Sequence, residues 1–297
     1  MCLILVSFKQ NSDYPLIVAA NRDEFYRRPT AALDWWQDAP DILGGADIAS
    51  AMKLGHPCPR DHAKTDIVSG AIPGHPCPRG GWLCVNRHGR FAAVTNFRQP
   101  GKDSKTAKSR GLIVRRYLEN ALTIADFARE LTNSAGDYNG YNLLFGSADE
   151  LWYYNNRSGI APAPVEPGLH VLSNAYLDTP WPKTLLAGKM FAELEGNPPP
   201  TDAVFTLLAN RTQANAEKVQ RTGLPLKYEV ALSSIFISLT IRRGWLFRKV
   251  GYGTRASSYV TFSRTGEISF NERTYTDGKP AGDRLANFLI PDFYRRC

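Results

Sequence analysis

The sequence has no hydrophobic run long enough to cross a bilayer. It has 297 residues, of which 43% are hydrophobic and 22% charged. Its apolar start, MCLILVSF, has no basic segment before it and a lysine directly after it, which is not the pattern of a secretory signal. We therefore expect a protein without a transmembrane segment that resides in the cytoplasm.

Cysteine is also scarce. Five cysteines are an odd number scattered over a long chain, which argues against a disulfide framework and favours a reducing compartment. They are Cys2, Cys58, Cys77, Cys84 and Cys297.

Acidic residues are too few to balance the basic ones, and the net charge is +8. The excess is local, because residues 241–249 carry +4 and residues 51–79 carry +2. The rest of the chain is nearly neutral, and no zinc-finger, RNP or helix-turn-helix pattern is present. We therefore expect no nucleic-acid partner.

Hairpins dominate both ends of the chain. Residues 2–8 and 16–21 are β-rich runs separated by the turn KQNSDYP. Residues 82–98 form a second hairpin pattern, residues 141–159 a third, and residues 252–276 a last one with Arg-Thr-Gly as its turn. A further strand is expected from residue 168 to Asn174.

Helical spacing appears between these hairpins. Residues 110–136 predict two helices, with Thr123 as the N-cap of the second. Residues 198–211 predict another helix behind three prolines, with Thr201 or Asp202 near its cap.

This order of elements predicts an α+β fold in one domain over residues 1–297. Two stretches interrupt the pattern and are predicted to be inserted loops. Residues 51–79 contain GHPCPR twice, at 55–60 and 74–79, and residues 240–250 are the basic run TIRRGWLFRKV.

Cys2 directly follows the initiator methionine. Removal of Met1 would leave an N-terminal cysteine whose thiol is a nucleophile and whose α-amine, with a pKa of about 7.7–8.0, can take the thiol proton. Polar residues at predicted strand ends could complete such a site as oxyanion donors or orienting groups: Arg22, Asp23, Asn96 and Asn174. The alternative is that Cys2 is a small buried hydrophobic residue and that Asn21–Glu24 is a salt-bridged turn.

Several motifs resemble the NRDE family, also known as the transport-and-Golgi-organisation family. They are MCLILVSF, ANRDEFYRRPT, GGWLCVNRHGRFAAVTNFR, SRGLIVRRYL, YNLLFG, VLSNA and YGTRASS. The resemblance covers nearly the whole chain. It implies an N-terminal-nucleophile hydrolase-like fold, in which two antiparallel sheets are stacked between helical layers in the order αββα.

The same pattern is similar to that of the choloylglycine hydrolase and penicillin V acylase group. By position, the resemblance implies catalytic roles for five residues and substrate contacts for three. The five are Cys2, Arg22, Asp23, Asn96 and Asn174, and the three are Asn21, Glu24 and Arg255. The chain departs from the family in its two inserts and in Cys84, which stands where a glycine is usual.

The repeated GHPCPR supplies two His/Cys pairs, which are His56, Cys58, His75 and Cys77. Such residues can ligate zinc, and Cys-Pro dipeptides resemble haem-responsive motifs. The simplest interpretation is a proline-rich loop without a metal. Trp35 and Trp36 could line a ligand cleft or form a half-buried lid.

Two functions are therefore predicted. One is a cysteine N-terminal-nucleophile hydrolase that cleaves an amide-like C–N bond of a small or lipid-like substrate and needs no cofactor. The other, which the resemblance also implies, is a non-enzymatic protein that binds haem or an acyl-lipid or acyl-CoA and takes part in its trafficking.

Overall fold

The structure is a computed structural model that describes residues 2–48, 80–243 and 248–291. Its first antiparallel sheet has the order β10-β1-β2-β12-β13-β14, and β11 also pairs with β12. These strands are β1 (Cys2–Phe8), β2 (Leu16–Phe25), β10 (Gly168–Leu172), β11 (Ser238–Arg243), β12 (Arg248–Phe262), β13 (Glu267–Thr276) and β14 (Lys279–Leu289).

The second antiparallel sheet follows chain order from β3 to β9. Its strands are β3 (Thr30–Trp36), β4 (Ala39–Asp47), β5 (Gly80–Asn86), β6 (Phe91–Asn96), β7 (Tyr141–Gly146), β8 (Leu151–Asn155) and β9 (Ala163–Pro164).

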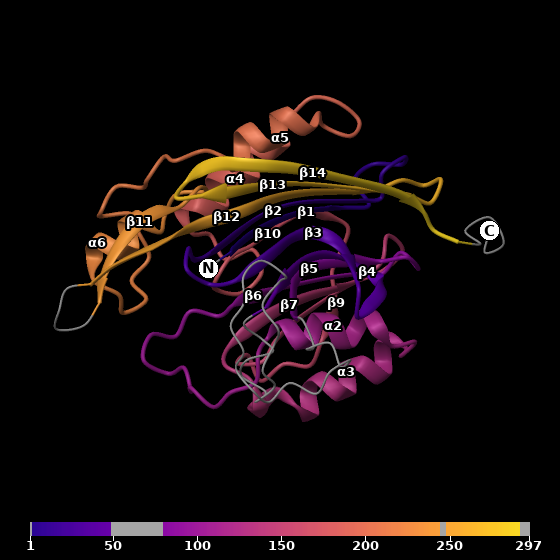
Figure 1. Cartoon of the computed structure of the whole chain (residues 1–297), viewed down its shortest axis with the longest axis horizontal. Helices are drawn as coiled ribbons and strands as arrows, with labels where there is room; N and C mark the ends of the chain where they lie inside the picture. The colour runs from indigo at the N-terminus through magenta and orange to yellow at the C-terminus, as the bar shows by residue number, and fades with distance from the viewer. Residues whose placement is uncertain (1, 49–79, 244–247, 292–297) are drawn as a thin grey trace, which may run out of the picture.

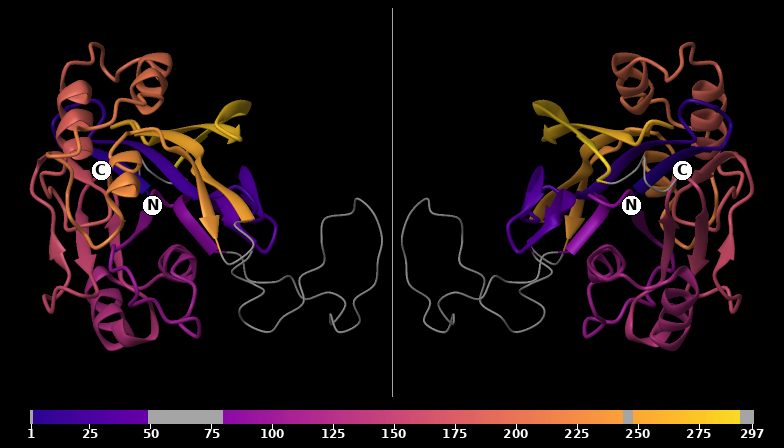
Figure 2. Two further views of the ribbon diagram at one scale, coloured as in Figure 1. Left: turned by 90° about the vertical axis from the view of Figure 1, so that its left-hand side faces the viewer. Right: turned by 90° about the vertical axis from the view of Figure 1, so that its right-hand side faces the viewer.

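Helices cover the outer face of each sheet (Figures 1 and 2). α2 (Gly111–Glu119) and α3 (Ile124–Asn133) lie over the second sheet, followed by the short 3₁₀ turn η1 (Ala135–Asp137). α4 (Pro182–Ala192) and α5 (Thr201–Leu208) lie over the first sheet, and α6 (Leu226–Ala231) follows near the end of β11.

Alternating side chains build three hydrophobic layers. In β1, Ile4 and Val6 enter the core between the sheets, whereas Leu3 and Leu5 pack under α4 and α5. Aromatic residues such as Tyr117 fill the layer between the second sheet and α2–α3. The predicted four-layer α+β sandwich of antiparallel sheets is therefore confirmed.

The local predictions are mostly confirmed as well. All four hairpins and the two helices around residues 110–136 are present, and the Thr123 side chain accepts a hydrogen bond from the Asp126 amide. Thr201 and Asp202 begin α5, as predicted near its cap, and the N-cap itself is Pro200, which makes no side-chain bond. The strand predicted to reach Asn174 ends at Leu172.

One insert is not the loop that was predicted. Within residues 240–250, Thr240 pairs with Gly251 and Ile241 with Val250, so the basic run extends the hairpin of β11 and β12. The regular pairing continues because Ile241 and Val250 are β-branched residues that suit a strand. The other insert, residues 51–79, lies outside the described residues.

Candidate active site

Cys2 is the first residue of β1 and lies at one end of the sandwich. Its partner across the ladder is Arg22 of β2. The thiol side chain is 8% exposed and lines a small cavity of about 90 Å³ together with Arg22, Asp23 and Asn96. Four of the five predicted catalytic residues therefore face one cavity.

The register of β1 and β2 places Asp23 beside the N-terminal side of Cys2. Because the strands are antiparallel and Cys2 lies opposite Arg22, the next residue of β2 passes the position that precedes Cys2. The Asp23 carboxylate is held by Thr254, whose Oγ1 donates to Oδ1 at 2.7 Å. Asp23 is thus placed where it could bind the α-amine of an N-terminal Cys2.

Burial dominates the protonation of these groups. It raises the pKa of the Cys2 thiol, although the nearby Arg22 charge lowers it in part. It also raises the pKa of Asp23, against the opposing effect of Lys183. The thiol therefore needs a base or a positive field to become a nucleophile.

Arg22 supplies one such charge. Its side chain is 7% exposed, and it makes no hydrogen bond or ion pair within the described part of the chain. The start of α2 supplies another, since Lys108–Gly111 line the same cavity and no side chain caps this helix. The helix approaches so closely because Gly111 has no Cβ, which would lie 2.9 Å from the Gly81 carbonyl oxygen.

Asn174 does not line this cavity but lies directly behind it. Its Nδ2 donates to the Asn96 carbonyl oxygen at 2.8 Å, and the neighbouring Ser173 hydroxyl donates to the Cys2 carbonyl at 3.0 Å. Asn174 thereby fixes the main chain at Asn96. The predicted oxyanion role of Asn174 stays a prediction. It depends on the second proton of Nδ2, because the first is donated to Asn96.

Glu24 lines the cavity but already has a cationic partner. Arg28 lies 3.2 Å from Glu24 and also pairs with Asp47. Burial raises the pKa of Glu24, but the charges of Arg28 and Arg22 and the hydrogen bond from the Phe25 amide together lower it, and the net pKa is below the usual value. Glu24 therefore contributes to a local salt bridge at the entrance.

Two predicted substrate contacts are not supported. Asn21 is fully buried under α5, where its amide donates to the carbonyls of Leu208 and Ile235 and its oxygen accepts from Ser257. The alternation of β2 points Asn21 away from the face that carries Arg22. Asn21 is therefore a structural residue.

Arg255 is the second predicted substrate contact that the structure does not support. Its guanidinium donates to the carbonyl oxygens of Phe25, Tyr26 and Arg28 and to Thr30 Oγ1. These bonds hold the connection between β2 and β3. Arg255 reaches only a neighbouring cavity of about 220 Å³, which shares Arg22 and Trp82 with the Cys2 cavity.

Glu272 is a titratable residue of this neighbouring cavity that the sequence did not indicate. It is 2% exposed, and its Oε1 accepts from the Leu33 amide at 2.6 Å. Burial raises the pKa of Glu272 to about 7. A carboxyl group that changes charge near neutral pH therefore lies one cavity away from Cys2.

Lys183, in the first turn of α4, was also missed. Its side chain is 1% exposed, and Nζ has no hydrogen-bond acceptor among the described residues. Burial lowers the pKa of Lys183 to about 8, although Asp23 opposes this shift. In the sequence, Lys183 lies on the same helical face as Ala187 and Phe191, and a lysine on such a face indicates a buried charge.

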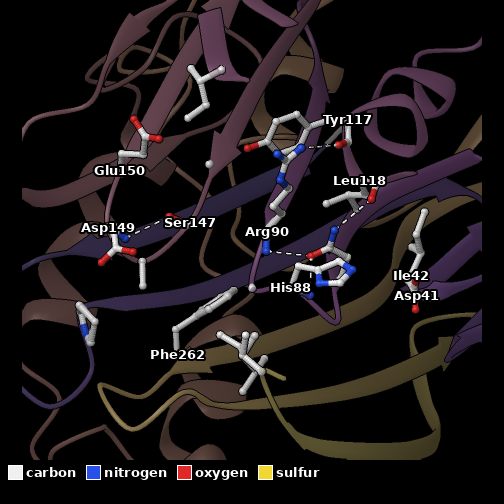
Figure 3. A pocket seen from close by; sticks show the side chains of 18 of the residues that line it. Asp41, Ile42, His88, Arg90, Tyr117, Leu118, Ser147, Asp149, Glu150 and Phe262 are labelled. Carbon is white, nitrogen blue, oxygen red and sulfur yellow. Dashed lines mark hydrogen bonds between the residues drawn. The ribbon is translucent and has the colours of Figure 1, made fainter. Parts of the chain in front are cut away.

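A much larger cavity, about 1460 Å³, opens at the opposite end of the sandwich (Figure 3). Turns and connections from both sheets line it, including those around Lys9, Asp41 and Ser147. Several of its polar side chains bind main-chain atoms. Arg90, for example, donates to the carbonyls of Asn120 and Leu122. We place the candidate active site at Cys2, because among the described residues this end combines a nucleophile with perturbed acid–base groups.

The tryptophans do not form a cleft. Trp36 is buried and donates from Nε1 to the Gly44 carbonyl at 2.9 Å. Trp35 packs edge-on against Phe288 and carries the Arg87 guanidinium 3.8 Å from its ring centre. The expectation of a half-buried lid fits Trp35 better than that of a ligand cleft.

No group of three or more potential metal ligands occurs in the described ranges. The predicted haem or zinc ligands are His56, Cys58, His75 and Cys77, and all four lie outside them. None of the helices in the described ranges is both long and apolar enough to cross a membrane.

Comparisons with known proteins give whole-length matches. The chain is 29% identical over 296 residues to the Transport and Golgi organization protein 2 homolog of Bos taurus, covering 94% of this chain and 95% of that one. It is 28% identical over 293 residues to the homolog of Homo sapiens, covering 93% and 94%. The Drosophila melanogaster protein is 24% identical over 314 residues and is covered to 99% on both sides.

Two solved structures also align along the chain. Both are variants of conjugated bile acid hydrolase from Clostridium perfringens. One has a TM-score of 0.41 and 11% identity and covers 97% of each chain. The other has a TM-score of 0.38 and 10% identity and covers 97% of this chain and 96% of that chain.

A family model described as Transport and Golgi organisation 2 matches residues 1–277. This span contains the NRDE motif at the end of β2, Cys2 at the start of β1, and every strand that lines the Cys2 cavity. The chain therefore belongs to the Transport and Golgi organisation 2 family.

Proposed function

We propose that this protein is a cysteine N-terminal-nucleophile hydrolase that cleaves an amide-like C–N bond. The observation that carries the proposal is the position of Cys2 at the start of a buried strand, facing a cavity with Arg22 and Asn96. Asp23 lies beside its N-terminal side. Loss of Met1 would place a base, the α-amine, on the same residue as the nucleophile.

The reaction would proceed through a thioester. The Cys2 sulfur attacks the substrate carbonyl carbon while the thiol proton passes to the α-amine. The tetrahedral intermediate collapses, the C–N bond breaks, and the leaving nitrogen takes that proton. Water then attacks the thioester, giving a carboxylic acid and regenerating the thiol.

The surroundings of Cys2 support charge development at this point. The Asn96 side chain and the uncapped start of α2 can stabilise an oxyanion, and Arg22 adds a buried positive charge. Asp23 can orient the α-amine through its carboxylate, which Thr254 holds in place. The cavity admits a small reacting group, and the rest of a substrate would lie outside it.

The test combines intact mass with a covalent trap. Purified protein is first weighed to see whether Met1 is lost, and it is then incubated with acyl p-nitroanilides of increasing acyl length. We expect loss of Met1, release of p-nitroaniline, and an acyl adduct on the Cys2 peptide. Cys2→Ala should abolish both release and adduct.

Cys84→Ala is the matched control, because Cys84 is fully buried and does not line the Cys2 cavity. It should leave release unchanged. A chain that retains Met1 and forms no adduct at Cys2 would contradict the proposal and would favour a binding function.

A further inference from the structure

Lys183 occupies a place where a lysine is costly. It shares the buried stripe of α4 with Ala187 and Phe191, at intervals of four residues. Ala187 and Phe191 pack with Leu3 and Leu5 of β1, so Lys183 lies one turn further toward the start of the helix on the face that covers the first sheet.

Three effects oppose its charge. The side chain is almost fully buried, it stands in the first turn of α4 where the helix dipole is positive, and the Arg98 charge is close enough to act on it. A lysine placed only for packing would extend its amine to water. Here Nζ is enclosed and has no hydrogen-bond acceptor in the described ranges.

The charged or ionisable groups that act on Lys183 lie on β1, on β2 and in the segment after β6. Asp23 of β2 and Cys2 of β1 favour its charged form, and Arg98, after β6, disfavours it. Arg98 is itself neutralised by Glu229 at 2.9 Å. Lys183 therefore interacts electrostatically mainly with Asp23 and with Cys2 at the start of β1.

We propose that Lys183 is a positioning residue for Cys2, whose positive charge keeps the freed α-amine in the neutral form that accepts the thiol proton. This inference rests on the proposed function. Asp23, which binds the amine, would by itself stabilise ammonium and so weaken the base. Lys183 offsets that effect from the helical side of the sheet, and the same charge also favours the thiolate.

The pKa of Lys183, lowered to about 8, gives this effect a pH limit. Below pH 8 the lysine is charged and assists deprotonation at Cys2. Above pH 8 it loses its proton and the assistance disappears. The lysine, the amine and the thiol then titrate as one coupled group.

The experiment measures the pH dependence of Cys2 alkylation. The chain is made with a removable N-terminal extension that a protease cleaves directly before Cys2, so that the free amine does not depend on natural maturation. Iodoacetamide labelling of the Cys2 peptide is followed by mass spectrometry between pH 5 and pH 10, for the natural sequence and for Lys183→Met and Lys183→Arg.

We expect Lys183→Met to shift the labelling profile to higher pH. A shift of one unit corresponds to a rate at pH 7 lower by about tenfold. The two profiles should converge above pH 8, and Lys183→Arg should restore the natural profile. Lys189→Met is the matched control on the same helix, since Lys189 is mostly exposed, and it should change nothing.

A purely structural role for Lys183 would leave the labelling profile of Cys2 unchanged in Lys183→Met. This variant removes a buried charge, so its melting temperature at pH 7 should rise. A raised melting temperature would also show that the variant folds. A Lys183→Met profile that overlays the natural one would overturn the inference. Failure of the proposed function would appear separately, as retained Met1 in the untagged chain or as the absence of an acyl adduct.

Discussion

The two ends of the sandwich differ in the size of their cavities and in the state of the polar groups around them, and the smaller cavity has the more reactive surroundings. The end with the large cavity has polar side chains that bind main-chain atoms: Asn86 accepts from the Arg90 amide of its own turn, and Arg90 donates to the Asn120 carbonyl after α2. The Cys2 end has a cavity about one-sixteenth as large, yet burial displaces the pKa values of a thiol, a carboxyl group and an amine around it. A large cavity shows only that the turns leave space, whereas displaced pKa values show that ionisable groups are buried, as is common at functional sites.

The largest expected effect concerns the ion pair behind the Cys2 end. Arg98 and Glu229 are 6% and 0% exposed, and Glu229 also accepts from the Thr222 amide and hydroxyl. Arg98→Met leaves the Glu229 carboxylate without its cation and should cost about 3–5 kcal/mol in the free energy of unfolding. Urea denaturation measures this.

The large-cavity end offers the control for that variant. Arg87 lies 3.6 Å from Asp41, and both side chains are about half exposed. Arg87→Met should cost at most about 1 kcal/mol, because water screens the ion pair and the half-exposed guanidinium gains little from its contact with the Trp35 ring. Equal losses in the two variants would contradict the contrast between the ends.

Glu272 gives a prediction that depends on pH. Its pKa is raised from 4.5 to about 7 in the folded chain, so the folded state binds a proton more tightly than the unfolded state. The stability that this proton confers is complete below pH 4.5 and is lost as the pH rises to 7. Glu272→Gln mimics the protonated form and should be neutral at pH 4 but stabilising at pH 8, by up to about 3 kcal/mol.

Thermal unfolding at the two pH values measures this difference. The glutamine can keep the acceptor for the Leu33 amide, so loss of that hydrogen bond does not confuse the comparison. Glu267→Gln, an exposed position at the start of the same strand, is the matched control and should show no pH-dependent gain. A Glu272→Gln variant that is less stable at pH 8 would show that the carboxylate is needed in the fold.

The sequence predicted the elements whose apolar spacing is regular. β1, β2 and β12 show it, and so does the helix from Gly111 to Glu119. β14 was missed because it is an edge strand with almost no buried residue, which removes the alternation that marks a strand. α4 was missed because Pro180 and Pro182 at its start indicated a broken loop and its buried stripe begins with a lysine.

The site was predictable in part for a related reason. Cys2, Arg22 and Asp23 are adjacent through a single hairpin, so their proximity follows from the turn between β1 and β2. The partners that come from distant elements were not visible. Lys183 reaches the site only because α4 packs over β1 and β10, and no local pattern records that packing.

Cys84 gives a prediction of intermediate size. A methyl group on Gly81 would collide with the Cys84 sulfur and lie 3.1 Å from Val114 Cγ1, so Gly81→Ala should cost about 1–3 kcal/mol. In a Cys84→Gly background the sulfur is gone and the cost should fall. A double-mutant cycle of urea midpoints measures the coupling between the two positions. Additive losses would show that the glycine and the cysteine are independent.

The smallest effect is expected at the large-cavity end, where Thr123 caps α3. Its hydroxyl accepts from the Asp126 amide at 3.1 Å and donates to the Asp126 carboxylate at 2.7 Å, so both bonds depend on one exposed side chain. Thr123→Ala should lower the free energy of unfolding by about 1 kcal/mol, and Thr123→Ser, which keeps the hydroxyl, should restore most of it. Cys2 labelling should be identical in all three proteins, because the cap lies at the far end of the sandwich. A changed labelling rate would mean that the two ends are energetically coupled, and the contrast between a structural end and a chemical end would then fail.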